Sequence, residues 1–269
     1  MKTATLFVLG FMGGSAYCAD LDPRQIVASS IFNYQKDWTA ALQYTYTEHD
    51  VTKDDSPTRE TVEISQISEL GGTPYSRLIG KNGHPLSAEE ARREEEKYRK
   101  VQSARDAETP DQRERRLRKY REQRAFLHEV PDAFNIKMLG RETIAGRPNY
   151  VIQLTPNPNY VPKSRNARMF ADIAGKLWID VDDLRWSKAE ADVIDTISIG
   201  WFLARIGPGA HITLTQFKID DEHWMLKEIT VKGLAKIMLV KNRSLDETVS
   251  CSDYRRVRST AGTPAAKNH

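Results

Sequence analysis

Alternating apolar and polar positions mark half-buried strands near the start of the chain. In "ALQYTYTEHDV", residues 41–51, Leu42, Tyr44 and Tyr46 alternate with polar residues. "ETVEISQI" continues the pattern with Val62 and Ile64. "PYSRLIGKNGHPL" predicts a third strand that ends in a turn at residues 81–83. A period of two predicts strands with one buried face, separated by turn residues.

A short helix is predicted before these strands, over residues 22–36. Asp22 can cap its first turn, and Pro23 occupies the position that tolerates a missing N–H group. Ile26, Ile31 and Tyr34 give this helix one apolar side.

Residues 87–130 follow a different pattern and predict a charged helical pair. The first helix begins with the capping box "SAEE", in which Ser87 is the cap and Glu90 lies three residues later. The second begins at Thr109 and Pro110 and carries many arginines. Few apolar residues occur in either helix, so each is expected to pack through a narrow stripe.

Residues 134–257 again read as strands, separated by Gly, Pro, Asn or Asp at intervals of about 8 to 12 residues, a spacing typical of antiparallel sheets. The stretch "DTISIGWFLARIGPG", residues 195–209, is predicted to be one strand running into a turn at Gly207–Gly209. Its apolar character ends at Arg205, which is too soon for a membrane span. Ile212 and Leu214 share one face whereas Phe217 falls on the other, so we expect bulges or strands that are apolar on both faces.

The N-terminus has the layout of a secretory signal peptide, with Lys2, a short apolar stretch and small residues up to Ala16. We therefore expect residues 1–19 to be removed, with cleavage near residues 16–19, and a periplasmic protein. Cys18 raises the alternative of a lipid anchor, but a small residue is expected directly before such a cysteine and Tyr17 is large. The small, polar residues 258–269 predict a disordered tail.

Composition and motifs argue against several classes of protein. The 269 residues carry a formal net charge of only +3, which does not favour a nucleic-acid partner. Zinc-binding spacings, nucleophile motifs and glycine-rich phosphate loops are absent from the sequence, so we predict no metal site, no cofactor and no catalytic residue. An enzyme with dispersed residues stays as an alternative, which a buried cluster of His211 or His223 with carboxylates would favour.

The hairpin "GRETIAGRPNYVIQLTPNPNY", followed by "GKLWIDVDDLRWSKAEADV", resembles the LolA-like superfamily of periplasmic proteins, which includes lipoprotein carriers and sensor-binding relatives. The resemblance covers roughly residues 23–257, with the helical pair 87–130 as an insertion. It implies an α+β fold: an incomplete antiparallel β-barrel, formed by a curved sheet, with helices covering the concave side. It also implies binding of lipid or of lipoprotein acyl chains, and contact with inner- or outer-membrane proteins.

Two sets of candidate site residues follow. Large apolar residues in or beside the strands are expected to line a hollow for an acyl chain: Trp38, Tyr44, Tyr46, Tyr150, Ile152, Leu177, Ile179, Ile199, Trp201, Phe202 and Leu214. The alternative function is an interaction module, in which the basic helix docks a protein partner through Arg113, Arg116 and Arg121.

Overall fold

A computed structural model of the chain describes residues 22–53, 60–199, 204–237 and 241–257. The predicted signal peptide and C-terminal tail lie outside these residues, as do Trp201 and Phe202. No helix in the part of the chain that is described is both long and apolar enough to cross a membrane.

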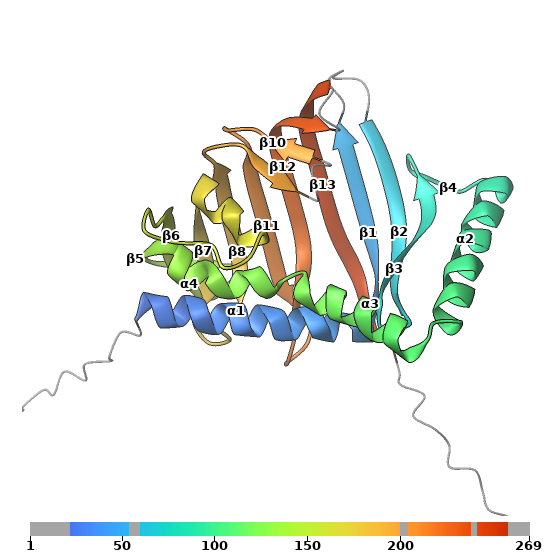
Figure 1. Cartoon of the computed structure of the whole chain (residues 1–269), viewed down its shortest axis with the longest axis horizontal. Coiled ribbons are helices and arrows are strands. Elements are labelled where there is room, and N and C mark those ends of the chain that lie inside the picture. Colours follow the sequence, from blue (N-terminus) through green and yellow to red (C-terminus); the bar gives the residue numbers. More distant parts are fainter. Residues whose placement is uncertain (1–21, 54–59, 200–203, 238–240, 258–269) are drawn as a thin grey trace, which may run out of the picture.

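The fold is α+β, with one curved antiparallel sheet and helices on its concave side (Figure 1). The strands are β1 (Tyr44–Lys53), β2 (Glu60–Leu70), β3 (Thr73–Lys81), β4 (His84–Pro85), β5 (Phe134–Ile144), β6 (Arg147–Pro156), β7 (Ile173–Asp180), β8 (Trp186–Val193), β9 (Ile197–Ile199), β10 (Ala204–Ile206), β11 (His211–Lys218), β12 (Trp224–Ile237) and β13 (Lys241–Arg256). The helices are α1 (Pro23–Ala40), α2 (Ala88–Asp106), α3 (Pro110–Glu122) and α4 (Val130–Ala133), with 3-10 turns η1 (Ala41–Gln43), η2 (Ala125–Glu129) and η3 (Asn166–Asp172).

The strand order is β4-β3-β2-β1-β13-β12-β11-β8-β7-β6-β5. The last strand of the chain therefore pairs with the first, in the middle of the sheet. Among the described residues the outer strands β4 and β5 do not pair with each other, so the sheet is an unclosed barrel, as the sequence predicts.

The predicted helix starts are confirmed by their capping contacts. The Asp22 carboxylate accepts a hydrogen bond from the Arg24 backbone N–H at 3.1 Å. Ser87 and Thr109 each form a complete capping box, with Glu90 and Gln112 respectively. These contacts satisfy N–H groups that have no partner within a helix, which fixes where α1, α2 and α3 begin.

Two hairpin turns have positive φ at both central residues, and the first of them forms where the sequence predicts it. Asn82 and Gly83 have φ angles of 50° and 79°, and Ala145 and Gly146 have φ angles of 49° and 79°. Positive φ at both central residues is the geometry of a type I′ turn, whose twist matches that of the flanking strands. The turns set the register of the β3–β4 and β5–β6 hairpins.

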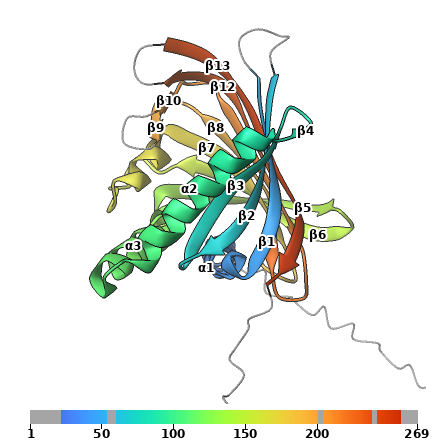
Figure 2. The same cartoon turned by 90° about the vertical axis from the view of Figure 1, so that its right-hand side faces the viewer.

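The helices are distributed unevenly over the sheet. α1 and α3 cross the lower part of the concave side, and η3 lies over β7 and β8 (Figure 1). α2 runs along the edge formed by β3 (Figure 2). The upper parts of β11, β12, β13 and β1 have no helix in front of them (Figure 1).

Candidate functional site

The inner face of the sheet, defined here as the face toward α1, can be followed across the strands through directly paired residues. Residues directly opposite each other in adjacent strands point to the same side of the sheet. One such row consists of Ile152, Leu177, Ala189, Leu214, Ile229, Val249 and Asp50, each paired with the next. The row begins beneath α1 and ends on β1. It therefore crosses one region on which helices pack and one region on which they do not.

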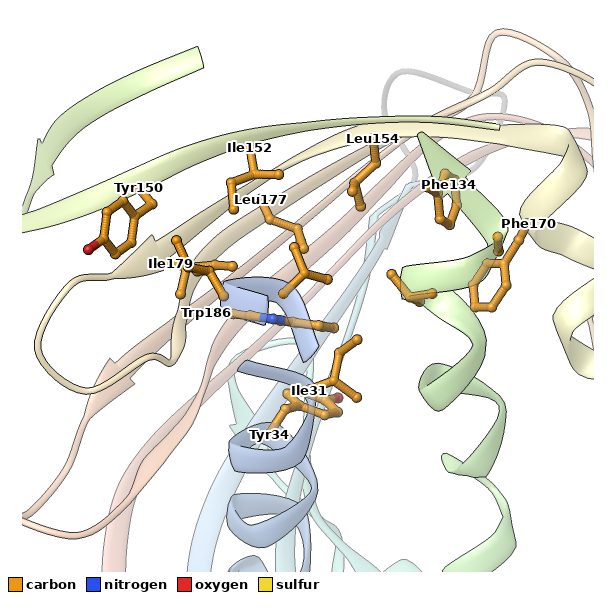
Figure 3. Packing of buried hydrophobic residues seen from close by; sticks show 14 of the residues in the cluster. Ile31, Tyr34, Phe134, Tyr150, Ile152, Leu154, Phe170, Leu177, Ile179 and Trp186 are labelled. Carbon is orange, nitrogen blue, oxygen red and sulfur yellow. The ribbon is translucent and has the colours of Figure 1, made fainter. Parts of the chain in front are cut away.

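In the first region, the covered half of the sheet, the interior is closely packed (Figure 3). The Ile152 side chain is 0% exposed and that of Leu177 is 5% exposed. The rings of Tyr34 and Trp186 stack at 4.6 Å, and the Trp186 Nε1–H donates to Ser30 Oγ at 2.8 Å. The side chains of α1, β6, β7 and β8 therefore fill the space beneath the helix.

Buried ion pairs fix this packing at one end of the covered half. The Arg185 guanidinium donates to the Asp37 carboxylate of α1 at 2.7 Å, and Asp37 is 3% exposed. Arg147 donates to both carboxylate oxygens of Asp180, at 2.6 and 2.7 Å, in the β7–β8 turn. Paired geometry of this kind holds the helix and the turn in one arrangement.

In the second region, the open half of the sheet, the same row is only partly buried. Leu214, Ile229 and Val249 are all intermediate in exposure, and none of them belongs to the buried clusters that the described residues form. These three residues are called the apolar strip. The buried Cys251, two residues after Val249, extends it along β13. This strip is an apolar surface without a covering helix, and it is the candidate binding face.

The opposite, outer face of the same strands is polar. Thr215, Glu228, Ser250 and His49 form the corresponding paired row. Thr230 and Thr248 also face outward, with their hydroxyl oxygens 3.4 Å apart. The apolar residues of these strands are therefore confined to the inner face, and they do not reflect a composition that is apolar throughout.

Carboxylates border the apolar strip on the inner face. Glu48 pairs with Cys251, Asp50 pairs with Val249, and Glu247 pairs with Thr52. Partial burial raises the pKa of Glu48, and repulsion from Asp50 and Glu247 raises it further. Burial followed by repulsion from Asp50 likewise raises the pKa of Glu247. Burial also raises the pKa of Asp50, which feels in addition the charge of Glu63.

These three groups, Glu48, Asp50 and Glu247, are called the acidic border. No cation is paired with any of them within the described part of the chain. Lys81 lies on β3, two strands away from β1, and pairs with Glu63 of β2 at 3.7 Å. No group of His, Cys, Asp or Glu in the described ranges has the arrangement of a metal site.

A small aromatic cavity of about 40 Å³ lies where α1, α3 and the sheet meet. Trp38 stacks on Tyr120 of α3 at 5.5 Å, and Arg124 lies 4.5 Å from the centre of the Trp38 ring. Three buried polar atoms here have no hydrogen-bond partner: Trp38 Nε1, the Tyr120 hydroxyl and Arg124 Nε. The cavity is large enough for water, which would satisfy such groups, but far too small for an acyl chain.

The structure separates the predicted lining residues into three groups. Tyr150, Ile152, Leu177 and Ile179 belong to the packed core of the covered half. Trp38, Tyr44 and Tyr46 border the small aromatic cavity. Leu214 lies on the open half, and Ile199 is in β9, where its backbone but not its side chain is described.

The stretch 195–209 forms two short strands and not one. β9 and β10 pair with each other through Ile197 and Ile206, and β10 continues onto the end of β12. Ile197 and Ile206 are buried with Val193 and Ala210, next to the partly buried Ile212 and Val231. The prediction of one strand was wrong because it read past Gly200, which follows Ile199 in the sequence and is a signal for a break between two strands.

The basic helix uses its charges largely within the molecule. Arg116 donates to both Glu108 carboxylate oxygens at 2.7 Å, and to the Gly71 carbonyl at 2.8 Å. Arg121 pairs with Glu114 at 2.7 Å, whereas Arg113 is exposed. Arg116 thus joins the α2–α3 turn to the β2–β3 turn.

His223 does form a cluster with a carboxylate. The Tyr44 hydroxyl donates to Asp220 and lies 3.1 Å from His223 Nδ1, which is also 3.1 Å from Asp220. Burial and the Asp220 charge raise the pKa of Tyr44 to about 12. These groups satisfy one another and tie the β11–β12 turn to β1. His211 instead pairs with Asp192 at an exposed site, at 2.7 Å.

No described protein family and no curated protein matches the sequence. Among solved structures, the chain is similar to a domain described as an outer membrane lipoprotein-sorting protein from Vibrio parahaemolyticus, at 12% identity and a TM-score of 0.37, over 88% of this chain and 95% of that one. A LolA superfamily protein from Nitrosomonas europaea matches at 10% identity and a TM-score of 0.36, over 86% and 93%. The MucA/MucB complex of Pseudomonas aeruginosa matches at 10% identity and a TM-score of 0.27, over 83% and 94%.

Proposed function

We propose that this protein is a periplasmic binding protein that holds lipid, or the acyl chains of a lipoprotein, on the open half of its inner face. The observation that carries the proposal is the row Leu214, Ile229 and Val249, which is apolar, partly exposed and outside the buried clusters of the described residues. The resemblance of the β5–β6 hairpin to LolA-like proteins supports the same class of ligand.

The energetics of an acyl chain suit such a surface. Burial of each methylene group is worth about 0.8 kcal/mol, so a long chain binds without a specific polar contact. The ligand would lie on the strip and not beneath α1, because the covered half is already filled by its own side chains.

The test compares adjacent residues of β12 that point to opposite faces. Ile229→Glu places a charge on the strip, whereas Thr230→Glu places the same charge on the polar outer face. Binding is measured as fluorescence of a neutral probe, the methyl ester of pyrenedodecanoic acid, added to delipidated protein. We expect Ile229→Glu to weaken binding at least about tenfold, equal to 1.4 kcal/mol, and Thr230→Glu to leave it near the wild-type value.

Melting temperatures of both variants establish that each is folded. Lipid extracted from the purified wild-type protein and identified by mass spectrometry provides an independent measurement. A wild-type preparation that carries no lipid and takes up no probe would overturn the proposal.

The interaction module stays as the second candidate through the exposed Arg113 on α3. Charge reversal at Arg113 would then abolish capture of the partner while probe binding is retained. Arg116 is unsuitable for this test because its loss would disturb the contact between α3 and the β2–β3 turn.

A further inference from the structure

The acidic border lies beside the proposed binding strip, on the same face of the sheet. Glu48 and Asp50 are two residues apart on β1, so both point inward. Glu247, two residues from Val249 on β13, also points inward. Three carboxylates from the paired strands β1 and β13 therefore lie next to the apolar strip on the inner face.

Among the side chains that the structure describes, those around these carboxylates carry little positive charge. On the inner face the neighbouring groups are Tyr46 and Cys251, the hydroxyl residues Ser65 and Thr52, and Glu63 with its partner Lys81. The acidic border thus combines partial burial with unneutralised negative charge. Partly buried charges of this kind are usually paired, and a complementary charge on a ligand would supply the missing partner.

We propose that the ligand of the open half is an amphiphile whose alkyl or acyl chain lies on Leu214, Ile229 and Val249, and whose cationic head group lies against Glu48, Asp50 and Glu247. This inference rests on the function proposed above and adds the charge of the ligand. The occupant is a lipid-type molecule with an ammonium head, because the charge alone would not use the apolar strip. A fatty acid or another anionic lipid would place like charges together and is disfavoured.

The experiment measures displacement of the neutral pyrene ester by three C12 compounds that differ only in the head group. Dodecylammonium, dodecanol and dodecanoate are compared at pH 7, in low salt and below their micelle-forming concentrations. We expect dodecylammonium to bind about tenfold more tightly than dodecanol, and dodecanoate to bind more weakly than both. Raising the salt concentration to 0.5 M should reduce the preference for the amine, because salt screens exposed charges.

A triple variant isolates the acidic border. Glu48→Gln, Asp50→Asn and Glu247→Gln together keep the shape of the face and remove its charge. The affinity for dodecanol should be retained, and the ratio between amine and alcohol should fall to near one. Glu228→Gln, which removes a carboxylate from the outer face of β12, is the matched control and should leave the ratio unchanged.

The outcomes distinguish this inference from the proposed function. If none of the three compounds displaces the probe and the probe itself does not bind, the proposed function fails. If all three bind equally, or if the triple variant keeps the preference for the amine, the function stands and the inference about charge is overturned. A lysine-rich peptide without an acyl chain that competes as strongly as dodecylammonium would also overturn it, in favour of a protein occupant.

Discussion

Leu177 and Leu214 occupy the same row of the inner face, with only Ala189 between them, yet their surroundings differ. Leu177 is packed beneath α1 at 5% exposure, whereas Leu214 is partly exposed on the open half. The sheet, the face and the residue type are the same, and only the strands differ, β7 for Leu177 and β11 for Leu214. The difference shows that one paired row of inner-face residues continues across the sheet. The position of the helices decides which part of that row is core and which part is available to a ligand.

The largest expected effect is on stability in the covered half. Leu177→Ala should lower the free energy of unfolding by about 3 kcal/mol, because it removes buried methyl groups and leaves a cavity. Leu214→Ala should cost only about 1 kcal/mol, because the side chain is already partly hydrated. Urea denaturation measures both values, with Thr215→Ala on the outer face as the control. Equal losses at Leu177 and Leu214 would show that the two halves do not differ in packing.

For ligand binding the order of the two variants should be reversed, with the larger loss of affinity in Leu214→Ala. Leu214→Ala removes part of the proposed binding strip and should weaken uptake of the pyrene ester several-fold. Leu177→Ala should leave uptake unchanged at a temperature where the variant is folded. Weaker uptake in Leu177→Ala alone would place the ligand beneath α1 instead.

A smaller effect is expected where α2 and α3 join the sheet. Arg116→Ala removes the contacts with Glu108 and with the Gly71 carbonyl, and should lower the Tm by about 3 °C. Arg113→Ala, at an exposed position of the same helix, should change the Tm by less than about 1 °C. Thermal unfolding monitored by circular dichroism provides the measurement. A Tm unaffected by Arg116→Ala would mean that this arginine is not a structural link.

The smallest effect is a gain in stability on the open half. Because the pKa of Glu247 is raised in the folded protein, its ionised form at pH 7 disfavours folding. Glu247→Gln should therefore stabilise the protein at pH 7 by about 0.3 kcal/mol. This gain should disappear as the pH falls toward 4, where the wild-type carboxyl binds its proton. A variant that is less stable than wild type at pH 7 would show that Glu247 makes a favourable contact.

The sequence predicts much of this architecture because its signals are local. The capping residues Ser87 and Thr109 fix the helix starts, and the Asn82–Gly83 turn fixes a hairpin. The predicted irregularity near Phe217 corresponds to a bulge between Thr215 and Gln216 in the β11–β12 pairing. The break between β9 and β10 does have a local signal, Gly200, which the prediction of one strand overlooked.

The candidate site was harder to predict, because it depends on which strands the helices cover and on the pairing of strands that are far apart in the sequence. Leu177 begins a run that is apolar on both faces, up to Ile179, whereas Leu214 lies between two threonines, but neither pattern indicates which strand α1 covers. Glu48 and Asp50 continue the face of Tyr44 and Tyr46, so their inward direction could have been inferred from alternation alone. Glu247 could not have been placed beside them without the pairing of β1 with β13.

The pairing of β1 with β13 also governs when the binding face can exist. Glu48 and Cys251 are direct neighbours in the sheet although nearly the whole chain separates them, so their contact must wait for the C-terminal strand. Pairings between such distant segments form slowly, because a long loop must close first. A nascent chain that has not yet reached residue 241 would hold two separate sheet fragments, and the strip would be split along the missing strand. The protein becomes competent for its ligand only after residues 241–256 have been synthesised and have paired with β1 and β12.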